Sequence, residues 1–210
     1  MRSAARVAVA ACALLVVLPF TAPAGAAKSP LLEKSDLPAG YSFDRSAQHR
    51  SDVVAQFPSV AGEDTACYLS PAAASDGPRA AIDTVTFTRD NRGTGGQSVW
   101  TFAKESAARA FFRRYARTLE RLPRCTTVVY DEDDDDQTPP TALGTYDDLD
   151  IGKVGDSRAA VVLQTANAQP RPRTAVFRDG ARVVLVQIAD ADLSPAEFRD
   201  LVMAADDRAG

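Results

Sequence analysis

One aspartate–glycine pair near the end of the chain constrains the fold more than any other local feature. Asp179-Gly180 separates two short segments rich in β-branched and apolar residues, 174–178 and 182–189. Glycine adopts positive φ at no steric cost, so this pair between two strand-like segments is typical of a tight hairpin turn. The sequence therefore predicts that the two segments pair antiparallel within a sheet.

A second hairpin is predicted in the middle of the chain. Residues 81–89 alternate, with Val85 and Phe87 on one face and threonines on the other, which is the pattern of a half-buried strand. A strand at 97–102 follows the glycine-rich connection 90–96. Further strand candidates are 125–130, 148–154 and 158–166.

Two helices are predicted around these strands. Residues 104–122 place apolar side chains at three- and four-residue spacing, and Pro123 ends the segment. Ser194-Pro195-Ala196-Glu197 combines a capping serine, an early proline and a glutamate three residues later, which indicates a closing helix. With a loop-rich start at 28–67 and strands joined by short turns, the fold class is α+β: a largely antiparallel β-sheet flanked by two main helices.

The first 27 residues have the pattern of a secretory signal peptide. Arg2 and Arg6 precede an apolar run that ends in small residues, 22–27, where a signal peptidase would cut. The uninterrupted run is shorter than the roughly 20 residues that a membrane-spanning helix needs. We expect cleavage after Ala26 or Ala27, a single domain at 28–210 without a transmembrane helix, and a secreted or cell-envelope location. Lipidation at Cys12 is the alternative, although the apolar run continues beyond that cysteine.

Cleavage would leave Cys67 and Cys125 as an even pair in an oxidising compartment, which predicts one disulfide. The alternative is a catalytic thiol, for which His49 is the only histidine available as a base. The chain has 24 basic and 28 acidic residues, so it lacks the basic excess of nucleic-acid-binding proteins, and we expect no nucleic-acid partner.

The sequence offers little for catalysis or for a cofactor. A hydrolase triad would place His49 beside an activated serine, but no Gly-x-Ser-x-Gly elbow is present. One histidine supports a zinc site poorly, and the loop 90–96 lacks the Lys-Ser/Thr ending of a phosphate-binding loop. We therefore predict no cofactor and no enzymatic activity. A small secreted hydrolase using carboxylates and His49 is the alternative.

Two charged segments are candidate sites. The acidic run 131–136 fails the EF-hand template at Asp136 and Ala142, so Asp131, Asp133 and Asp135 are at most a weak divalent-cation site. Opposite the apolar stripe, the long helix presents an arginine face that could bind an anionic partner or pair with the acidic run. The arginine face consists of Arg109, Arg113, Arg114, Arg117 and Arg121.

Several short segments resemble exported actinobacterial sensor-like domains, including the extracellular sensor domain of a mycobacterial serine/threonine kinase. These segments are 36–41 (DLPAGY), 102–112 opening the long helix, 154–156 (VGD) and 176–180 (VFRDG) with the valines that follow. The resemblance implies an antiparallel sheet flanked by helices, a cleft, disulfide support and no enzymatic activity. The sequence departs from that family in lacking a second cysteine pair.

These observations together predict a non-enzymatic extracytoplasmic binding or sensor-like module. Its partner would be a small molecule, a peptide or an anionic envelope component. A purely structural protein-interaction domain is the remaining alternative.

Overall fold

The predicted hairpin forms, but its two turn residues lie one position later in the sequence than Asp179-Gly180. In a computed structural model, β9 (Pro172–Asp179) and β10 (Arg182–Asp190) pair antiparallel, with Asp179 opposite Arg182. Gly180 and Ala181 are thus the two turn residues, and only Gly180 has positive φ, at 53°. Glycine at the first turn position is the pattern of a type II′ turn.

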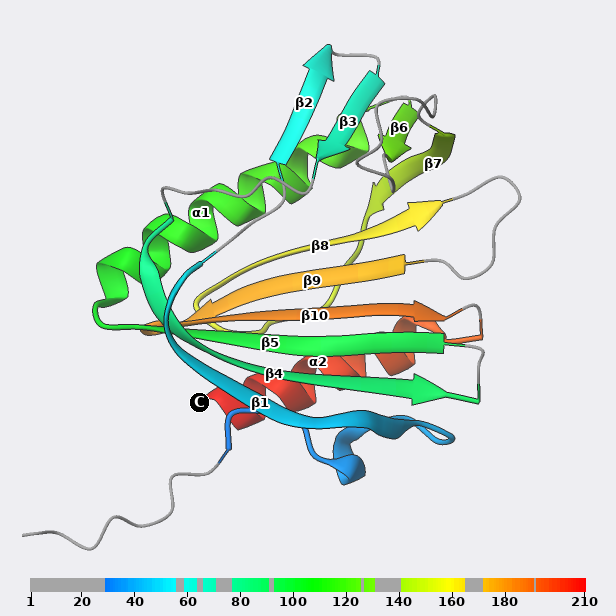
Figure 1. Cartoon of the computed structure of the whole chain (residues 1–210). Coiled ribbons are helices and arrows are strands. Elements are labelled where there is room, and N and C mark those ends of the chain that lie inside the picture. The colour runs from blue at the N-terminus through cyan, green and yellow to red at the C-terminus, as the bar shows by residue number, and fades with distance from the viewer. Residues whose placement is uncertain are drawn as a thin grey trace, which may run out of the picture.

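The structure describes residues 29–55, 59–63, 66–70, 77–90, 93–125, 127–130, 141–164, 172–190 and 192–210. Their strands form one ten-stranded sheet in the order β1-β4-β5-β10-β9-β8-β7-β6-β3-β2 (Figure 1). All neighbours are antiparallel except β3 and β6, which pair in parallel. The remaining strands are β1 (Ser42–Val54), β2 (Ser59–Glu63), β3 (Ala66–Ser70), β4 (Arg79–Arg89), β5 (Gly93–Phe102), β6 (Thr127–Tyr130), β7 (Thr141–Asp148) and β8 (Ser157–Gln164).

Three sequence expectations for the strands are wrong. The predicted loop-rich start, 28–67, contains the long edge strand β1 and strand β2. The glycine-rich connection 90–96 is mostly strand, because β5 begins at Gly93. Glycine is required there by packing, since a Cβ at Gly95 would collide with the Phe87 ring. Residues 149–154, predicted as strand, follow the end of β7 as a connection.

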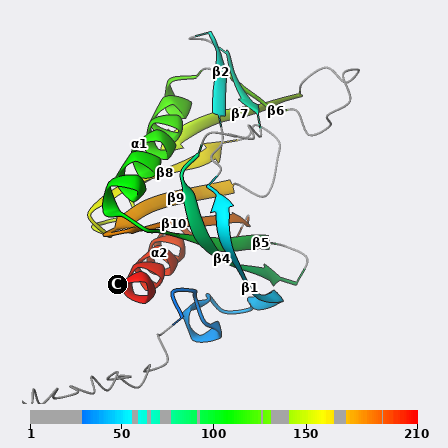
Figure 2. The same ribbon diagram turned by 60° about the vertical axis from the view of Figure 1, so that its left-hand side comes forward.

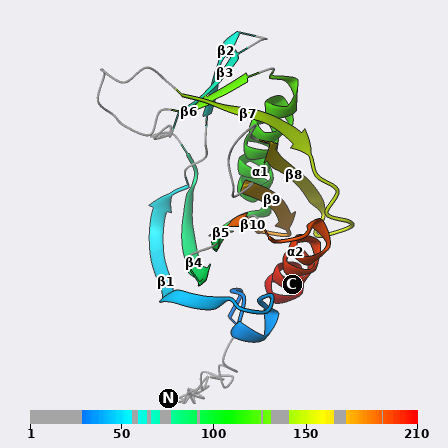
Figure 3. The ribbon, with the colours of Figure 1, turned by 90° about the vertical axis from the view of Figure 1, so that its right-hand side faces the viewer.

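The two α-helices described cover opposite faces of the sheet. Helix α1 (Glu105–Arg121) packs on the face that carries Val183 and Leu185 of β10, whereas α2 (Pro195–Ala209) packs on the face of Val184 and Val186. The sheet curls around α1, so we call the α1 side the concave face and the α2 side the convex face (Figure 3). The predicted α+β architecture, an antiparallel sheet with two main helices, is confirmed.

Both helices form for the reasons that the sequence indicates. The predicted apolar stripe of α1 is buried, and Phe111 lies with its ring centroid 5.2 Å from that of Trp100 and 5.4 Å from that of Phe102. At the start of α2, the Glu197 amide donates to Ser194 Oγ (3.2 Å), and the Ser194 amide donates to the Glu197 carboxylate (2.8 Å). The predicted capping box is therefore present. Two short 3-10 helices, η1 (Lys34–Asp36) and η2 (Leu122–Arg124), complete the elements.

Residues 29–41 form an N-terminal strap that crosses the convex face beside α2 (Figure 2). Leu31 and Leu32 are buried in the convex core. The Leu32 amide donates to the side chain of the buried Gln97 (2.7 Å), whose amide group donates in turn to the Pro30 carbonyl (3.2 Å). A polar side chain from the middle of the sheet therefore fixes the backbone of the strap.

Other sequence expectations fall partly or wholly outside the described residues. The segment 1–27 and the acidic run 131–136 lie outside them, so the signal peptide and the candidates Asp131, Asp133 and Asp135 stay predictions. Cys125 is buried, but the side chain of Cys67 is not among those described, so the pairing of the two cysteines stays a prediction. Within the described ranges, no helix is both long and apolar enough to span a bilayer.

Candidate ligand-binding groove

Helix α1 covers only part of the concave face. A groove of about 620 Å³ lies at the end of the sheet where β4 and β10 end and β5 and β9 begin, to the right in Figure 1. This volume falls within the range of small-molecule sites. Its lining includes Asp44, Thr84, Thr86, Thr88, Thr94, Gly96, Ser98, Arg173, Thr174, Leu185 and Gln187.

The strand register explains why the groove is lined with hydroxyl groups. Thr84 of β4 lies opposite Ser98, which lies opposite Leu185 of β10. One row further along, Thr86 lies opposite Gly96, and Gly96 opposite Gln187. Side chains of alternate residues share one face, so these rows continue the concave face beyond the side chains that α1 covers.

The alternation of 81–89 predicts this face correctly for β4. Val85 and Phe87 are buried in the convex core, and the threonines point the other way into the groove. The expectation of a glycine-rich loop over 90–96 hides the contribution of β5. Thr94, Gly96 and Ser98 are spaced two residues apart, and this period of two is the signal that could have revealed the strand.

The groove is hollow at its centre because Gly96 has no side chain. A Cβ at that position would meet the Val85 carbonyl oxygen at 3.0 Å, so the cross-strand packing disfavours any larger residue. Beside it, Leu185 is 8% exposed and forms a mainly apolar floor. The centre of the groove is therefore flat and apolar, and hydroxyl groups surround it.

Most of these hydroxyl groups are available to a ligand. Within the described part of the chain, five of them make no side-chain hydrogen bond: Thr84, Thr86, Thr88, Thr94 and Ser98. The Gln187 amide lies 3.4 Å from Thr174 Oγ1, which is a long contact, and Gln187 is exposed. An exposed hydroxyl both donates and accepts, so the groove can match polar groups of either kind.

A buried charged cluster lies where β10 ends. The carboxylate of Asp190 has no solvent exposure and accepts hydrogen bonds from the Tyr41 hydroxyl and from Arg89 Nη2 (2.7 Å). Burial, followed by the hydrogen bond to Asp190, raises the pKa of Tyr41 above its ordinary value. The cluster joins the strap, β4 and β10. Its three residues lie far apart in the sequence, so no local sequence pattern reveals it.

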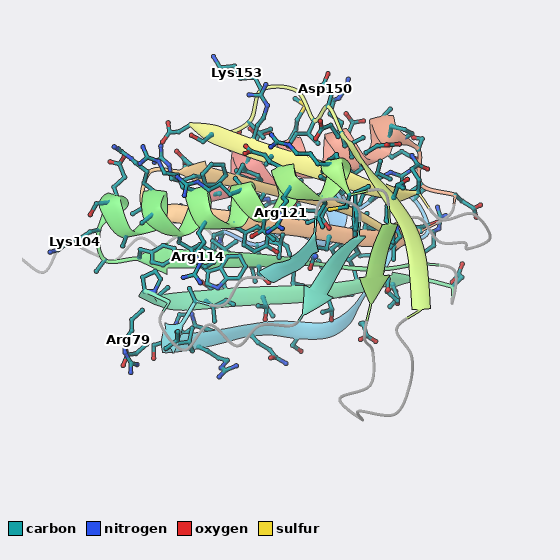
Figure 4. All side chains as sticks on the ribbon, turned by 90° about the horizontal axis from the view of Figure 1, so that it is seen from above. Arg79, Lys104, Arg114, Arg121, Asp150 and Lys153 are labelled. Carbon is teal, nitrogen blue, oxygen red and sulfur yellow. The ribbon has the colours of Figure 1, made fainter. Side chains whose placement is uncertain are left out.

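The predicted arginine face is exposed on α1, separate from the groove lining. All five side chains are exposed, and Arg109 pairs with Glu105 (2.6 Å) one turn earlier. Arg114 and Arg121 lie along α1 in Figure 4 and make further contacts. Arg113 and Arg117 have no ion-pair partner among the described residues. The helix therefore presents two guanidinium groups that are not paired with any described residue.

The single histidine lies away from the groove. His49 of β1 is 62% exposed, and its Nδ1 lies 2.7 Å from the Asp83 carboxylate. Among described residues, no serine, threonine or cysteine side chain hydrogen-bonds to His49. In the same part of the chain, no group of three histidine, cysteine, aspartate or glutamate side chains is placed to hold a metal ion.

A curled antiparallel sheet with one helix inside, one outside and an open groove defines an α+β class of domain. The structure is similar to the extracellular domain of PknH from Mycobacterium tuberculosis, with a TM-score of 0.56 and 17% sequence identity over 85% of this chain and 92% of that one. At this identity the likeness concerns the fold, and it confirms the resemblance inferred from the sequence. No family model and no curated protein matches the sequence.

Proposed function

We propose that this protein is a non-enzymatic extracytoplasmic binding module that holds its ligand in the concave groove. The observation that carries the proposal is the set of five hydroxyl groups around the groove that have no side-chain partner among the described residues. Solvent-facing strand residues need no such concentration of hydroxyls in one hollow, whereas a binding site uses a few polar groups to orient its ligand.

The geometry favours binding over catalysis. General acid–base chemistry needs a base within hydrogen-bond reach of a nucleophile or a substrate proton. Neither His49 nor Asp83 lines the groove, and its described lining contains no cysteine or histidine. The one carboxylate of that described lining, Asp44, is an exposed residue of the edge strand β1. The similar structure is the extracellular domain of PknH, which supports a sensor-like role for this chain.

Export completes the proposal. Residues 1–27 would be removed as a signal peptide, and residues 28–210 would act outside the cytoplasm, secreted or held at the envelope. Cys67 would pair with the buried Cys125 in that oxidising compartment. Protein recovered from culture medium should then begin at Ala27 or Lys28 by N-terminal mass analysis. An acylated form that begins at Cys12 would contradict this.

The groove can be tested without knowing the ligand. A library of small neutral and charged fragments is screened against the mature protein by ¹H–¹⁵N NMR, and binding fragments should shift the amide signals of β4, β5 and β10. Thr86→Trp, at an exposed groove position, should fill the hollow and abolish these shifts. Ser106→Trp, at an exposed position on α1, is the control and should leave them unchanged. Shifts that cluster elsewhere would contradict the proposal.

A second binding surface is favoured by one observation, the exposure of Arg113 and Arg117 without a described partner. We propose that an anionic envelope component binds this arginine face. The acidic run, with Asp131, Asp133 and Asp135, remains a proposed weak divalent-cation site, for which calorimetry should give a millimolar dissociation constant for calcium.

A further inference from the structure

The groove offers a ligand almost no charge. Of its neutral polar lining residues, seven have side chains on the concave face: Thr84, Thr86, Thr88, Thr94, Ser98, Thr174 and Gln187. Two charged residues also line it. Asp44 is an exposed residue of the edge strand β1, and Arg173 is buried, with Nη1 3.4 Å from the Asp190 carbonyl oxygen and a register that places it opposite Ile188 of the convex core. An anionic ligand would lose hydration here and meet the exposed Asp44 carboxylate, whereas Arg173 faces the convex core, so the groove favours an uncharged ligand over an anionic one.

The groove also suits a ligand that combines hydroxyl groups with carbon surface. Alternate residues on a strand lie about 7 Å apart and neighbouring strands about 4.8 Å apart, so the hydroxyls form a grid over three strands. Each threonine adds a methyl group beside its hydroxyl, and Gly96 with Leu185 leaves a flat floor. The face of a sugar ring has the same two properties, C–H groups and peripheral hydroxyls.

Building on the proposed binding function, we infer that the groove binds a short neutral oligosaccharide. The ring faces lie on the floor formed by Gly96 and Leu185, and the sugar hydroxyls exchange hydrogen bonds with the threonines of β4 and β5. The grid extends about 14 Å along β4 from Thr84 to Thr88 and a similar distance across the sheet from β4 to β9, which is larger than one sugar ring.

The inference is tested by NMR titration of the full mature protein. The probes are linear neutral oligosaccharides of four to six residues (glucan, mannan, galactan and arabinan) and an oligogalacturonate of equal length as the charged comparison. At least one neutral chain should give saturable shifts of the Thr86, Gly96 and Gln187 amides. The oligogalacturonate should bind at least tenfold more weakly.

Substitutions that remove a hydroxyl and keep the shape sharpen the test. Thr86→Val and Thr94→Val should each weaken neutral-chain binding about fivefold, the loss expected for one hydrogen bond. Thr145→Val, at an exposed position of β7 outside the groove lining, is the matched control and should bind normally. Gln187→Ala provides an independent loss of one polar group if either valine variant is unstable.

The possible outcomes distinguish a failure of the carbohydrate inference from a failure of the proposed binding function. Groove shifts with a charged chain or with a neutral peptide of Gly, Ser and Asn, but with none of the neutral sugars, would overturn the carbohydrate class and leave a binding groove. No groove shift with any fragment, peptide or sugar would overturn both. Neutral-chain binding that Thr86→Val and Thr94→Val leave unchanged would place the sugar elsewhere and overturn the inference.

Discussion

A single hydroxyl, that of Tyr41, links the strap to the buried carboxylate of Asp190. The folded protein raises the pKa of Tyr41, mainly through burial, so folding favours the protonated phenol. The unfolded chain ionises Tyr41 near pH 10. The contribution of this group to stability is therefore complete below pH 10 and is lost as the pH rises above it.

Tyr41→Phe should remove this part of the alkaline decline in stability. At neutral pH the variant should be less stable by about 1–3 kcal/mol, because Asp190 loses one of its buried donors. The measurement is urea unfolding from pH 7 to pH 11. If wild type and variant decline in parallel above pH 10, the Tyr41 hydroxyl is not the group responsible.

The charged carboxylate of Asp206 destabilises the folded protein, unlike a carboxylate whose pKa folding lowers. Burial and the nearby Asp179, Asp207 and Asp156 raise its pKa, although the Gly155 amide donates to it (3.0 Å). The folded state therefore binds the proton more tightly than the unfolded state, whose pKa is near 3.9. Stability from this group is present below that pH and is lost as the pH rises through the raised pKa.

Asp206→Asn should therefore melt at a higher temperature than wild type at pH 7, because it keeps an acceptor for Gly155 and removes the charge. The difference should disappear near pH 3, where the wild-type carboxyl is protonated. Asp207→Asn, at an exposed neighbouring position, serves as the control and should change the melting temperature less. Equal effects of the two substitutions would show that net charge alone is responsible.

At the scale of elements, helix α1 provides the clearest test of a partner surface. Arg113→Glu with Arg117→Glu should abolish salt-sensitive retention on vesicles that contain anionic lipid, while changing stability little because these side chains are exposed. Arg50→Glu with Arg158→Glu makes the same change in charge at exposed positions on β1 and β8. Equal loss of retention in both variants would show general electrostatics instead of a surface on α1.

The elements also show what sequence patterns can predict. Helix α1 and the capped α2 were predicted because each buries a stripe of side chains at helical spacing. Strand β1 was missed because it pairs only with β4 at the edge of the sheet, and most of its side chains are exposed polar groups. The part of the groove that β4 contributes can be predicted, because its threonines alternate with the apolar Val85 and Phe87. The part that β5 contributes cannot, because its glycines resemble a loop although they serve cross-strand packing.

For the whole molecule, the proposed disulfide joins β3 to the segment between α1 and β6. The loop from Cys67 through Cys125 contains 59 residues, and closing it stabilises the fold by about 4 kcal/mol in the chain-entropy model. Unfolded, unreduced protein from the medium should therefore contain no free thiol, and reduction should lower its melting temperature. Two reactive thiols in a dye-labelling assay would refute the pairing and revive the catalytic-thiol alternative.

The ion pairs between Arg208 and the strap determine on which side of the molecule it can be attached to something else. Its guanidinium pairs with Glu33 and with Asp36 (2.9 Å), which brings the end of α2 next to the beginning of the described chain. Both lie on the convex face, whereas the groove opens on the concave face. Anything joined before residue 29 or after Gly210, whether a sensor chip, a partner domain or a lipid surface, therefore departs from behind the sheet. The groove would then face away from whatever the protein is attached to.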